Sequence, residues 1–172
     1  MKETIKFGVI LSLICLISAG LLAFVYGLTK EKILNQKKTE EMSALKEVLP
    51  AASQIEEATT SSGLVYYIGY DQAKREIGRA IITTARGYGG DIVICIGIDK
   101  EGKILAVKIL SHNETPGLGS NIAQPSFLHK FKNRSVGEIG KQDAITGATI
   151  SSSAVINALK EKITELSAKI GQ

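Results

Sequence analysis

An uncharged stretch of 22 residues, from Phe7 to Leu28, constrains this chain more than any other feature. As an α-helix it would be about 33 Å long, which matches the hydrocarbon thickness of a bilayer. The alternative is a cleaved signal peptide, whose apolar region usually runs about 7–15 residues and ends at a small-x-small site. This stretch is longer and has no convincing cleavage site. We therefore expect residues 1–28 to form a retained, single-pass anchor in the plasma membrane.

The charges on either side of this stretch leave its orientation open. Lys2 and Lys6 precede it, whereas the residues that follow include Lys30, Lys32, Lys37 and Lys38. Counting them slightly favours a cytoplasmic C-terminal part, but long domains cross membranes largely regardless of charge.

The composition excludes several classes of function. Lys and Arg total 21 against 17 acidic residues, which is too mild and too scattered a balance for nucleic-acid binding. The chain has two cysteines and two histidines, without the spacing that zinc, iron–sulfur or haem sites need. The glycine motifs of nucleotide-binding loops are also missing. If a redox group is bound, these exclusions leave flavin as the candidate.

The residues after the anchor change character near residue 50. Residues 29–49 are rich in Lys, Glu, Ala and Leu and lack glycine, which predicts a helical stalk that ends at Pro50. Residues 51–63 combine two acids with a Thr-Thr-Ser-Ser run, which is typical of a loop. We therefore assign residues 29–63 to a stalk and linker, and residues 64–172 to a folded domain.

Short β-branched and aromatic runs within that domain predict four strands, at residues 64–70, 77–84, 92–98 and 104–110. Residues 99–102 suit a hairpin turn, and residues 92–96 suit a central strand in which Cys95 is buried. Residues 120–133 are expected to form one short helix and residues 135–142 a loop. A last helix is predicted by the apolar stripe Ile156, Leu159, Ile163, Leu166 and Ile170. The expected fold is α+β: a transmembrane helix followed by a small antiparallel sheet flanked by helices.

A run of small hydroxyl residues, from Asp143 to Ser152, leads directly into this last helix. Hydroxyl groups at that position can accept hydrogen bonds from the first free N–H groups of the helix. The same helix end attracts a phosphate, because the free N–H groups and the helix dipole both favour an anion there. From the pattern alone, an ordinary capped helix and an anion site are both open. We expect Asp143 to hold the turn through hydrogen bonds to the backbone.

Two glycine-rich segments accompany this run. Residues 86–90 contain three glycines around Tyr88, which allow positive φ and close approach of the backbone. Residues 111–119 include Pro116 and Gly117, a pair that predicts a type II turn. By themselves these segments are surface loops, and His112 is expected to be a surface histidine.

The order of the three segments resembles the FMN-binding domain family, with Gly-Tyr-Gly-Gly at residues 87–90, Glu-Thr-Pro-Gly-Leu-Gly at 114–119 and Asp-x-x-Thr-Gly-Ala-Thr at 143–149. The resemblance covers about residues 64–159. It implies covalent FMN, attached to Thr149 through a phosphoester by a dedicated flavin transferase. It also implies that the isoalloxazine ring meets the 114–119 loop. The expected cofactor-binding residues are Thr149, Asp143, Thr146, Gly147, Ala148, Ser151, Ser152, Glu114, Thr115, Gly117, Leu118, Gly119 and Tyr88.

A short chain of this kind, with one span, is similar within that family to the G subunit of Rnf complexes. The resemblance implies an electron-carrying subunit, working with other membrane subunits that couple ferredoxin:NAD electron transfer to sodium or proton translocation. It places the flavin domain outside the cytoplasm, and it calls for no catalytic acid or base in this chain. A stand-alone anchored flavoprotein and a non-redox binding module remain as alternatives.

Overall fold

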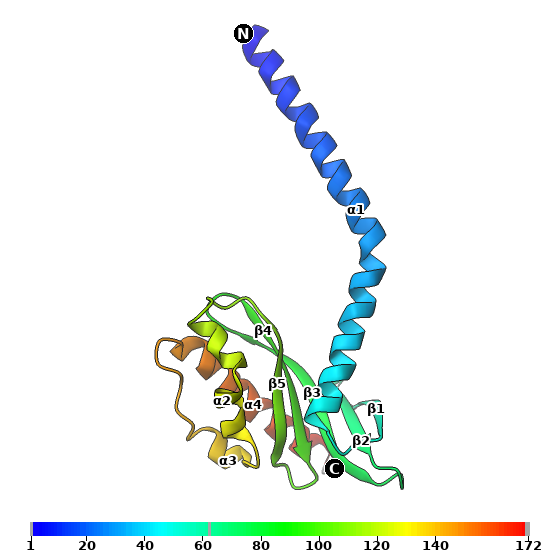
Figure 1. Ribbon diagram of the computed structural model, residues 1–172, viewed down its shortest axis with the longest axis vertical. Helices are drawn as coiled ribbons and strands as arrows, with labels where there is room; N and C mark the ends of the chain where they lie inside the picture. The colour runs from blue at the N-terminus through cyan, green and yellow to red at the C-terminus, as the bar shows by residue number, and fades with distance from the viewer. Residues whose placement is uncertain (1, 62, 171–172) are drawn as a thin grey trace. The chain divides into compact units, whose positions relative to one another are not determined.

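The computed structural model describes residues 2–61 and 63–170 (Figure 1). Its contacts divide the chain into two units, Met1–Thr39 and Glu40–Gln172. Helix α1 (Lys2–Val48) begins in the first unit and ends just before Pro50, as the sequence predicts. Within the described residues, α1 is the one helix that is long and apolar enough to cross a membrane. Its membrane-spanning length is exposed in the isolated chain, as a lipid-facing helix would be.

The second unit contains a five-stranded sheet in which every neighbouring pair of strands is antiparallel. The strands follow the order of the chain from one edge to the other: β1 (Gln54–Thr59), β2 (Val65–Tyr70), β3 (Glu76–Arg86), β4 (Asp91–Asp99) and β5 (Ile104–His112). The last four match the four predicted strands, which confirms the expected α+β fold. Strand β4 lies between β3 and β5 and is buried along most of its length, as its apolar sequence requires.

The first strand differs from the loop that the sequence predicts throughout residues 51–63. Strand β1 pairs with β2 over its whole length, with Ile55 opposite Gly69. It is exposed at most positions, so it shows no apolar alternation, and its β structure comes from the backbone hydrogen bonds of the neighbouring strand. The division of the chain at residues 28 and 63 stays a prediction.

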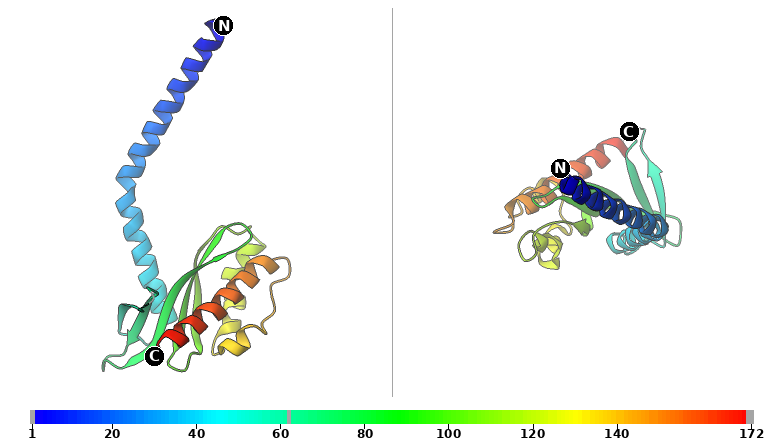
Figure 2. Two further views of the ribbon diagram at one scale, coloured as in Figure 1. Left: turned by 180° about the vertical axis from the view of Figure 1, so that it is seen from behind. Right: turned by 90° about the horizontal axis from the view of Figure 1, so that it is seen from above.

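Each face of the sheet carries its own apolar cluster. One face packs against α4 (Thr149–Ile170) through Ile94, Ile96, Leu159 and Ile163, all fully buried, and Figure 2 shows α4 lying across the sheet. The opposite face packs against the end of α1 and the residue after it, where Leu45, Val48 and Leu49 meet Ala80 and Cys95. Burial raises the pKa of the Cys95 thiol to about 12, which fits the small buried residue predicted there.

The segment between β5 and α4 forms several short helical pieces in place of the single helix that the sequence predicts. In place of one helix over residues 120–133, the chain forms η1 (Gly119–Ala123), α2 (Pro125–Leu128) and η2 (His129–Phe131). Pro125 starts a new helix because its ring lacks an N–H group and fixes φ, which suits the first turn. Phe127 and Phe131 make an edge-to-face pair within the core.

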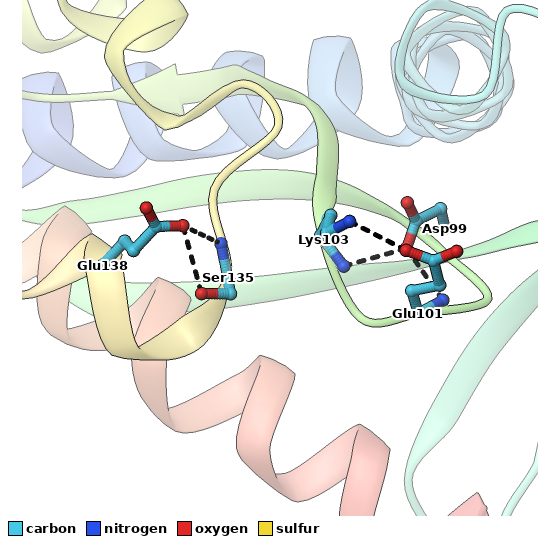
Figure 3. Close-up of polar contacts among 5 residues, drawn as sticks. All are labelled: Asp99, Glu101, Lys103, Ser135 and Glu138. Atoms are coloured by element: carbon cyan, nitrogen blue, oxygen red, sulfur yellow. Dashed lines mark hydrogen bonds and ion pairs between the residues drawn. The ribbon is translucent and has the colours of Figure 1, made fainter.

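Residues 135–142 also differ from the predicted loop, because they contain a one-turn helix, α3 (Val136–Ile139). The Glu138 carboxylate accepts hydrogen bonds from the N–H and hydroxyl of Ser135, both at 3.1 Å, in a capping box (Figure 3). These hydrogen bonds lower the pKa of Glu138. The turn between β4 and β5, also in Figure 3, is closed by Asp99, which accepts from the N–H groups of Glu101 and Lys103.

Candidate functional site

A cleft of about 420 Å³ lies where three segments far apart in the sequence meet. They are the turn between β3 and β4, the segment after β5, and the start of α4. The cleft is lined by Tyr88, Glu114, Thr115, Leu118, Gly119, Gly147, Ala148, Thr149, Ile150 and Ser151. Nine of these ten residues belong to the set expected from the sequence.

The start of α4 presents free backbone donors to this cleft. The Ala148 N–H donates to the Ile145 carbonyl at 2.9 Å, and the first helical hydrogen bond runs from the Ser152 N–H to the Ala148 carbonyl. Among the described residues, the N–H groups of Thr149, Ile150 and Ser151 have no acceptor. Together with the helix dipole, these three donors make the position favourable for an anion.

Gly147 precedes these donors with φ of +80°, a left-handed conformation that glycine adopts without strain. A Cβ atom built there would touch only the Leu118 side chain, at 3.5 Å. Glycine is therefore needed for the shape of the turn rather than for lack of space. The turn brings the backbone of residues 147–149 to the wall of the cleft.

Three hydroxyl groups in the first turn of α4 have different surroundings. Ser152 is fully buried, donating to the Ala148 carbonyl at 2.8 Å and accepting from the Ile145 N–H at 3.1 Å. Ser151 is also buried and donates to the Glu114 carboxylate. Thr149 is exposed, and its hydroxyl has no hydrogen-bond partner among the described residues. Only the Thr149 hydroxyl is therefore available to a reagent from solvent.

Glu114 is a buried carboxylate beneath the cleft, with both oxygens engaged. Oε1 accepts from the Gly89 N–H at 3.1 Å, and Oε2 accepts from the Ser151 hydroxyl. The Glu114 N–H in turn donates to His112 Nδ1 at 3.2 Å, which gives this histidine a structural role. One carboxylate thus ties together the three segments that form the cleft.

The glycines around Glu114 allow its close approach. A Cβ atom at Gly87 would lie 2.1 Å from Glu114 Oε1, and one at Gly119 would lie 2.7 Å from Oε2. The predicted close approach at residues 86–90 is confirmed, but none of these glycines has positive φ. Substitution would push the carboxylate out of place, since real Cβ atoms do not approach so closely.

The mouth of the cleft is apolar and exposed. Residues 115–118 form the predicted type II turn: Gly117 has φ of +76°, and the Leu118 N–H donates to the Thr115 carbonyl at 3.2 Å. Leu118, Tyr88 and Ile150 are 51%, 72% and 56% exposed. Ile150 is the one lining residue outside the expected set. A signal for it exists in the sequence, because this isoleucine lies off the buried stripe of α4, at a position that otherwise favours polar residues.

Four expected site residues lie outside the cleft lining: Asp143, Thr146, Gly117 and Ser152. The expectation that Asp143 holds the turn by hydrogen bonds to the backbone is wrong. Its carboxylate is exposed and without a hydrogen-bond partner among the described residues, and the buried Ser152 hydroxyl holds the turn instead. The described residues contain no cluster of His, Cys, Asp and Glu that would hold a metal ion.

Comparison with known proteins agrees with this geometry. Residues 87–164 match the FMN-binding domain, and residues 1–48 match the RnfG N-terminal region. The chain is 33% identical to the G subunit of the ion-translocating oxidoreductase complex of Methanosarcina acetivorans, over 99% of this chain and 98% of that protein. It is 28% identical to the G subunit of the proton-translocating ferredoxin:NAD(+) oxidoreductase complex of Clostridium ljungdahlii, over 94% and 90%.

The fold is also similar to the crystal structure of NqrC from Shewanella oneidensis, with a TM-score of 0.53, 19% identity and 66% of each chain covered. Fold, cleft and family match together define an anchored FMN-binding domain protein. More narrowly, the chain belongs to the family formed by the G subunits of ion-translocating oxidoreductase complexes, which it matches over nearly its whole length.

Proposed function

We propose that this chain is the membrane-anchored electron-transfer subunit of an Rnf-type complex and carries FMN on Thr149 through a phosphoester. The observation that carries the proposal is the Thr149 hydroxyl, exposed and without a partner among the described residues, beside three free N–H groups at the start of α4. A phosphoester on that oxygen would bring the phosphate charge to the helix end that favours it.

The residues of the cleft fit the flavin. A cleft of about 420 Å³ has the size of a small-molecule site. Leu118, Ile150 and Tyr88 offer apolar and aromatic surface at its mouth, where a ring system needs contacts. Thr115 and Gly119 also line the cleft, and we expect polar groups of these residues to form hydrogen bonds with the ring. Bound FMN would supply the electron transfer itself, and the chain positions it.

The attachment requires an outside catalyst. Glu114 is the one carboxylate that lines the cleft, and both of its oxygens are already occupied by Ser151 and Gly89. Among the described residues, nothing in the cleft is free to take the proton of the Thr149 hydroxyl. We therefore assign this step to a flavin transferase, which uses FAD. The Thr149 oxygen displaces AMP from FAD to form the phosphoester, and the transferase accepts the proton.

The partners follow from the family. Relatives bear the names of ion-translocating oxidoreductase subunits, and one name includes ferredoxin and NAD(+). We propose that this chain likewise works with several other membrane subunits, in ferredoxin:NAD electron transfer coupled to sodium or proton translocation. The span itself contains no Asp, Glu, Lys, Arg or His, so we assign the ion path to those partners.

We further propose that the flavin domain lies on the extracytoplasmic side of the membrane, where a tether keeps a flavin that would otherwise diffuse away. An impermeant maleimide applied to intact cells tests this with Lys100→Cys, in the exposed turn after β4. Cys95 should stay unlabelled, because it is buried and its thiol pKa is raised to about 12. Labelling only after the cells are opened would place the domain in the cytoplasm.

The proposed function is tested by producing the full chain together with a flavin transferase. We expect a fluorescent flavin band that persists on a denaturing gel, and co-purification with polytopic membrane subunits from the native host. A fluorescent chain that purifies alone would indicate a stand-alone flavoprotein. A chain that never acquires flavin would leave a non-redox module as the remaining interpretation.

A further inference from the structure

Strand β5 is an edge of the sheet, and most of its outward backbone groups have no hydrogen-bond partner among the described residues. In the described part of the chain, only the first residue of β5 forms backbone hydrogen bonds on that side: the Ile104 N–H donates to the Arg134 carbonyl at 3.0 Å, and the Asn133 N–H donates to the Ile104 carbonyl at 2.7 Å. Among the described residues, no backbone group of residues 105–110 makes a hydrogen bond beyond β4. About half of the polar groups of such a strand point away from its one neighbour, which makes it a template for another strand.

A groove of about 340 Å³ follows this open edge. Glu47 and Val48, from the end of α1, form one wall, and the α2 and η2 segment forms the other. The groove is lined by Glu47, Val48, Ala106, Val107, Lys108, Ile109, Ala123, Pro125, Leu128, His129 and Lys132. Both walls lie in the compact unit that contains the sheet. The arrangement leaves a slot beside β5 in which an extended chain would have apolar contacts on both sides.

The opposite edge of the sheet shows how differently the two edges are protected. Strand β1 reads Gln-Ile-Glu-Glu-Ala-Thr, and its Glu56 and Glu57 side chains are exposed. Exposed charges of this kind keep other strands from adding to an edge. Strand β5 begins Ile-Leu-Ala-Val-Lys-Ile-Leu, with Lys108 as its one charge before His112. A long apolar edge with so little protection is expected to be covered in the assembled protein.

The charges around the groove indicate what covers it. Lys108 is paired with Glu47, the only carboxylate in the lining, whereas Lys132 has no ion pair among the described residues. Pairing with a second copy would juxtapose two such basic grooves and, when centred on Lys108, would set lysine opposite lysine, which is unfavourable. An acidic partner meets neither obstacle.

We propose that an extended segment of another protein, bearing an acidic side chain near Lys132, adds to the sheet as a sixth strand beside β5. Main-chain hydrogen bonds would give the affinity, and the apolar walls and Lys132 would give the selectivity. This surface is separate from the flavin cleft, so the inference stands whether or not Thr149 carries FMN.

Hydrogen exchange of the full chain tests strand addition directly. The chain is purified alone in detergent and, through the same affinity tag, in mild detergent from its native membranes with the proteins it retains. We expect those amides of residues 105–110 that point away from β4 to exchange at least about tenfold more slowly in the second sample, with β1 amides unchanged. Equal exchange in both samples overturns the proposal, whether or not a protein is retained. Protection that appears in the isolated chain as its concentration rises would show a second copy instead.

Charge reversal supplies the matched variants. Lys132→Glu should reduce retention of the partner by about tenfold, since it places a carboxylate opposite the partner's acid. Lys130→Glu is the control, because Lys130 is exposed, two residues away, and outside the groove lining. If both variants lost the partner equally, the loss would come from the change in net charge and not from the groove, and the assigned binding site would be overturned. Loss for Lys132→Glu with no protection of β5 amides would show side-chain docking and exclude the added strand.

Discussion

The candidate flavin cleft has a buried floor and an exposed mouth, which are built from neighbouring residues but differ in how their polar groups are paired. In the floor, the Glu114 oxygens, the Ser151 and Ser152 hydroxyls and the Gly89 N–H all have partners. At the mouth, the Thr149 hydroxyl and the N–H groups that follow it have none among the described residues. Ser151 and Thr149 are only two residues apart. Whether each hydroxyl is buried and paired or exposed and unpaired is therefore set by the direction in which its side chain leaves the first turn of α4.

This difference in hydrogen bonding separates the residues that stabilise the structure of the site from those that would bind the ligand. Buried polar groups are costly unless paired, so the floor is fixed by its hydrogen bonds and tolerates little change. Exposed groups at the mouth cost the fold nothing and stay available for a phosphate and a ring. Substitutions in the floor should therefore cost stability, and substitutions at the mouth should change the flavin with little effect on the fold.

Thr149→Ala should give the largest effect, a complete loss of covalent flavin. The substitution removes the exposed hydroxyl at the start of α4 but no side-chain hydrogen bond among the described residues, so the free energy of unfolding should change by less than about 0.5 kcal/mol. In-gel flavin fluorescence and urea denaturation measure the two quantities. Thr146→Ala is the control, with a hydroxyl that is exposed but outside the cleft lining, and it should keep its flavin. Loss in the control instead would move the attachment to Thr146.

Glu114→Ala should be the most damaging change to the fold itself. It leaves the Ser151 hydroxyl and the Gly89 N–H without their acceptor and opens a cavity, at a cost of about 3 kcal/mol. Urea denaturation of the detergent-solubilised chain, followed by tyrosine fluorescence, measures this cost. Glu57→Ala, on exposed strand β1, should change stability by less than about 0.5 kcal/mol. If the two substitutions lowered the free energy of unfolding equally, the Glu114 hydrogen bonds would contribute no more to stability than an exposed side chain does.

Ser152→Ala should have a smaller effect, about 1–2 kcal/mol of stability. The Ile145 N–H loses its acceptor, and the turn before α4 loses the contact that closes it. Covalent flavin should remain, since this hydroxyl is buried away from the cleft lining. The same denaturation experiment on Ser153→Ala, a half-buried neighbour, provides the reference. Loss of flavin without loss of stability would show that Ser152 contacts the ligand.

Leu118→Ala should have only a small effect on the fold, because the side chain is about half exposed. Attachment should be complete, but the ring would lose an apolar neighbour and meet more water. We expect a shifted flavin absorption spectrum and greater quenching by iodide, which are measured on the purified chain. An unchanged spectrum and unchanged quenching would place the ring elsewhere than against the turn at residues 115–118.

The sequence predicts most of the fold because its signals are local. The charge-free span, the apolar β4 and the stripe on α4 each determine an element through its own residues. Strand β1 is not predicted by its own residues, since they are mostly polar and form a strand only through pairing with β2. Helix α3 is within reach of prediction, because Ser135 and Glu138 have the spacing of a capping box, a signal that the loop prediction overlooks.

The candidate site divides in the same way. Its segments are recognisable from their motifs, which bring Thr149, Leu118 and Tyr88 to one cleft as expected. The buried role of Glu114 depends on partners 25 and 37 residues away and has no local pattern. Ser152 takes the turn-holding role expected of Asp143, because the direction of its side chain in the first turn of α4 brings its hydroxyl to the Ile145 N–H.

Fragment mass spectrometry of the tryptic peptide that spans residues 142–160 tests the central claim most directly. The peptide contains Thr146, Thr149, Ser151, Ser152 and Ser153, so one spectrum compares every hydroxyl of the turn. Protein made in cells with the flavin transferase should carry FMN on Thr149 alone, as a phosphoester with loss of water. FMN on another of these hydroxyls, or an unmodified peptide from such cells, would contradict the account.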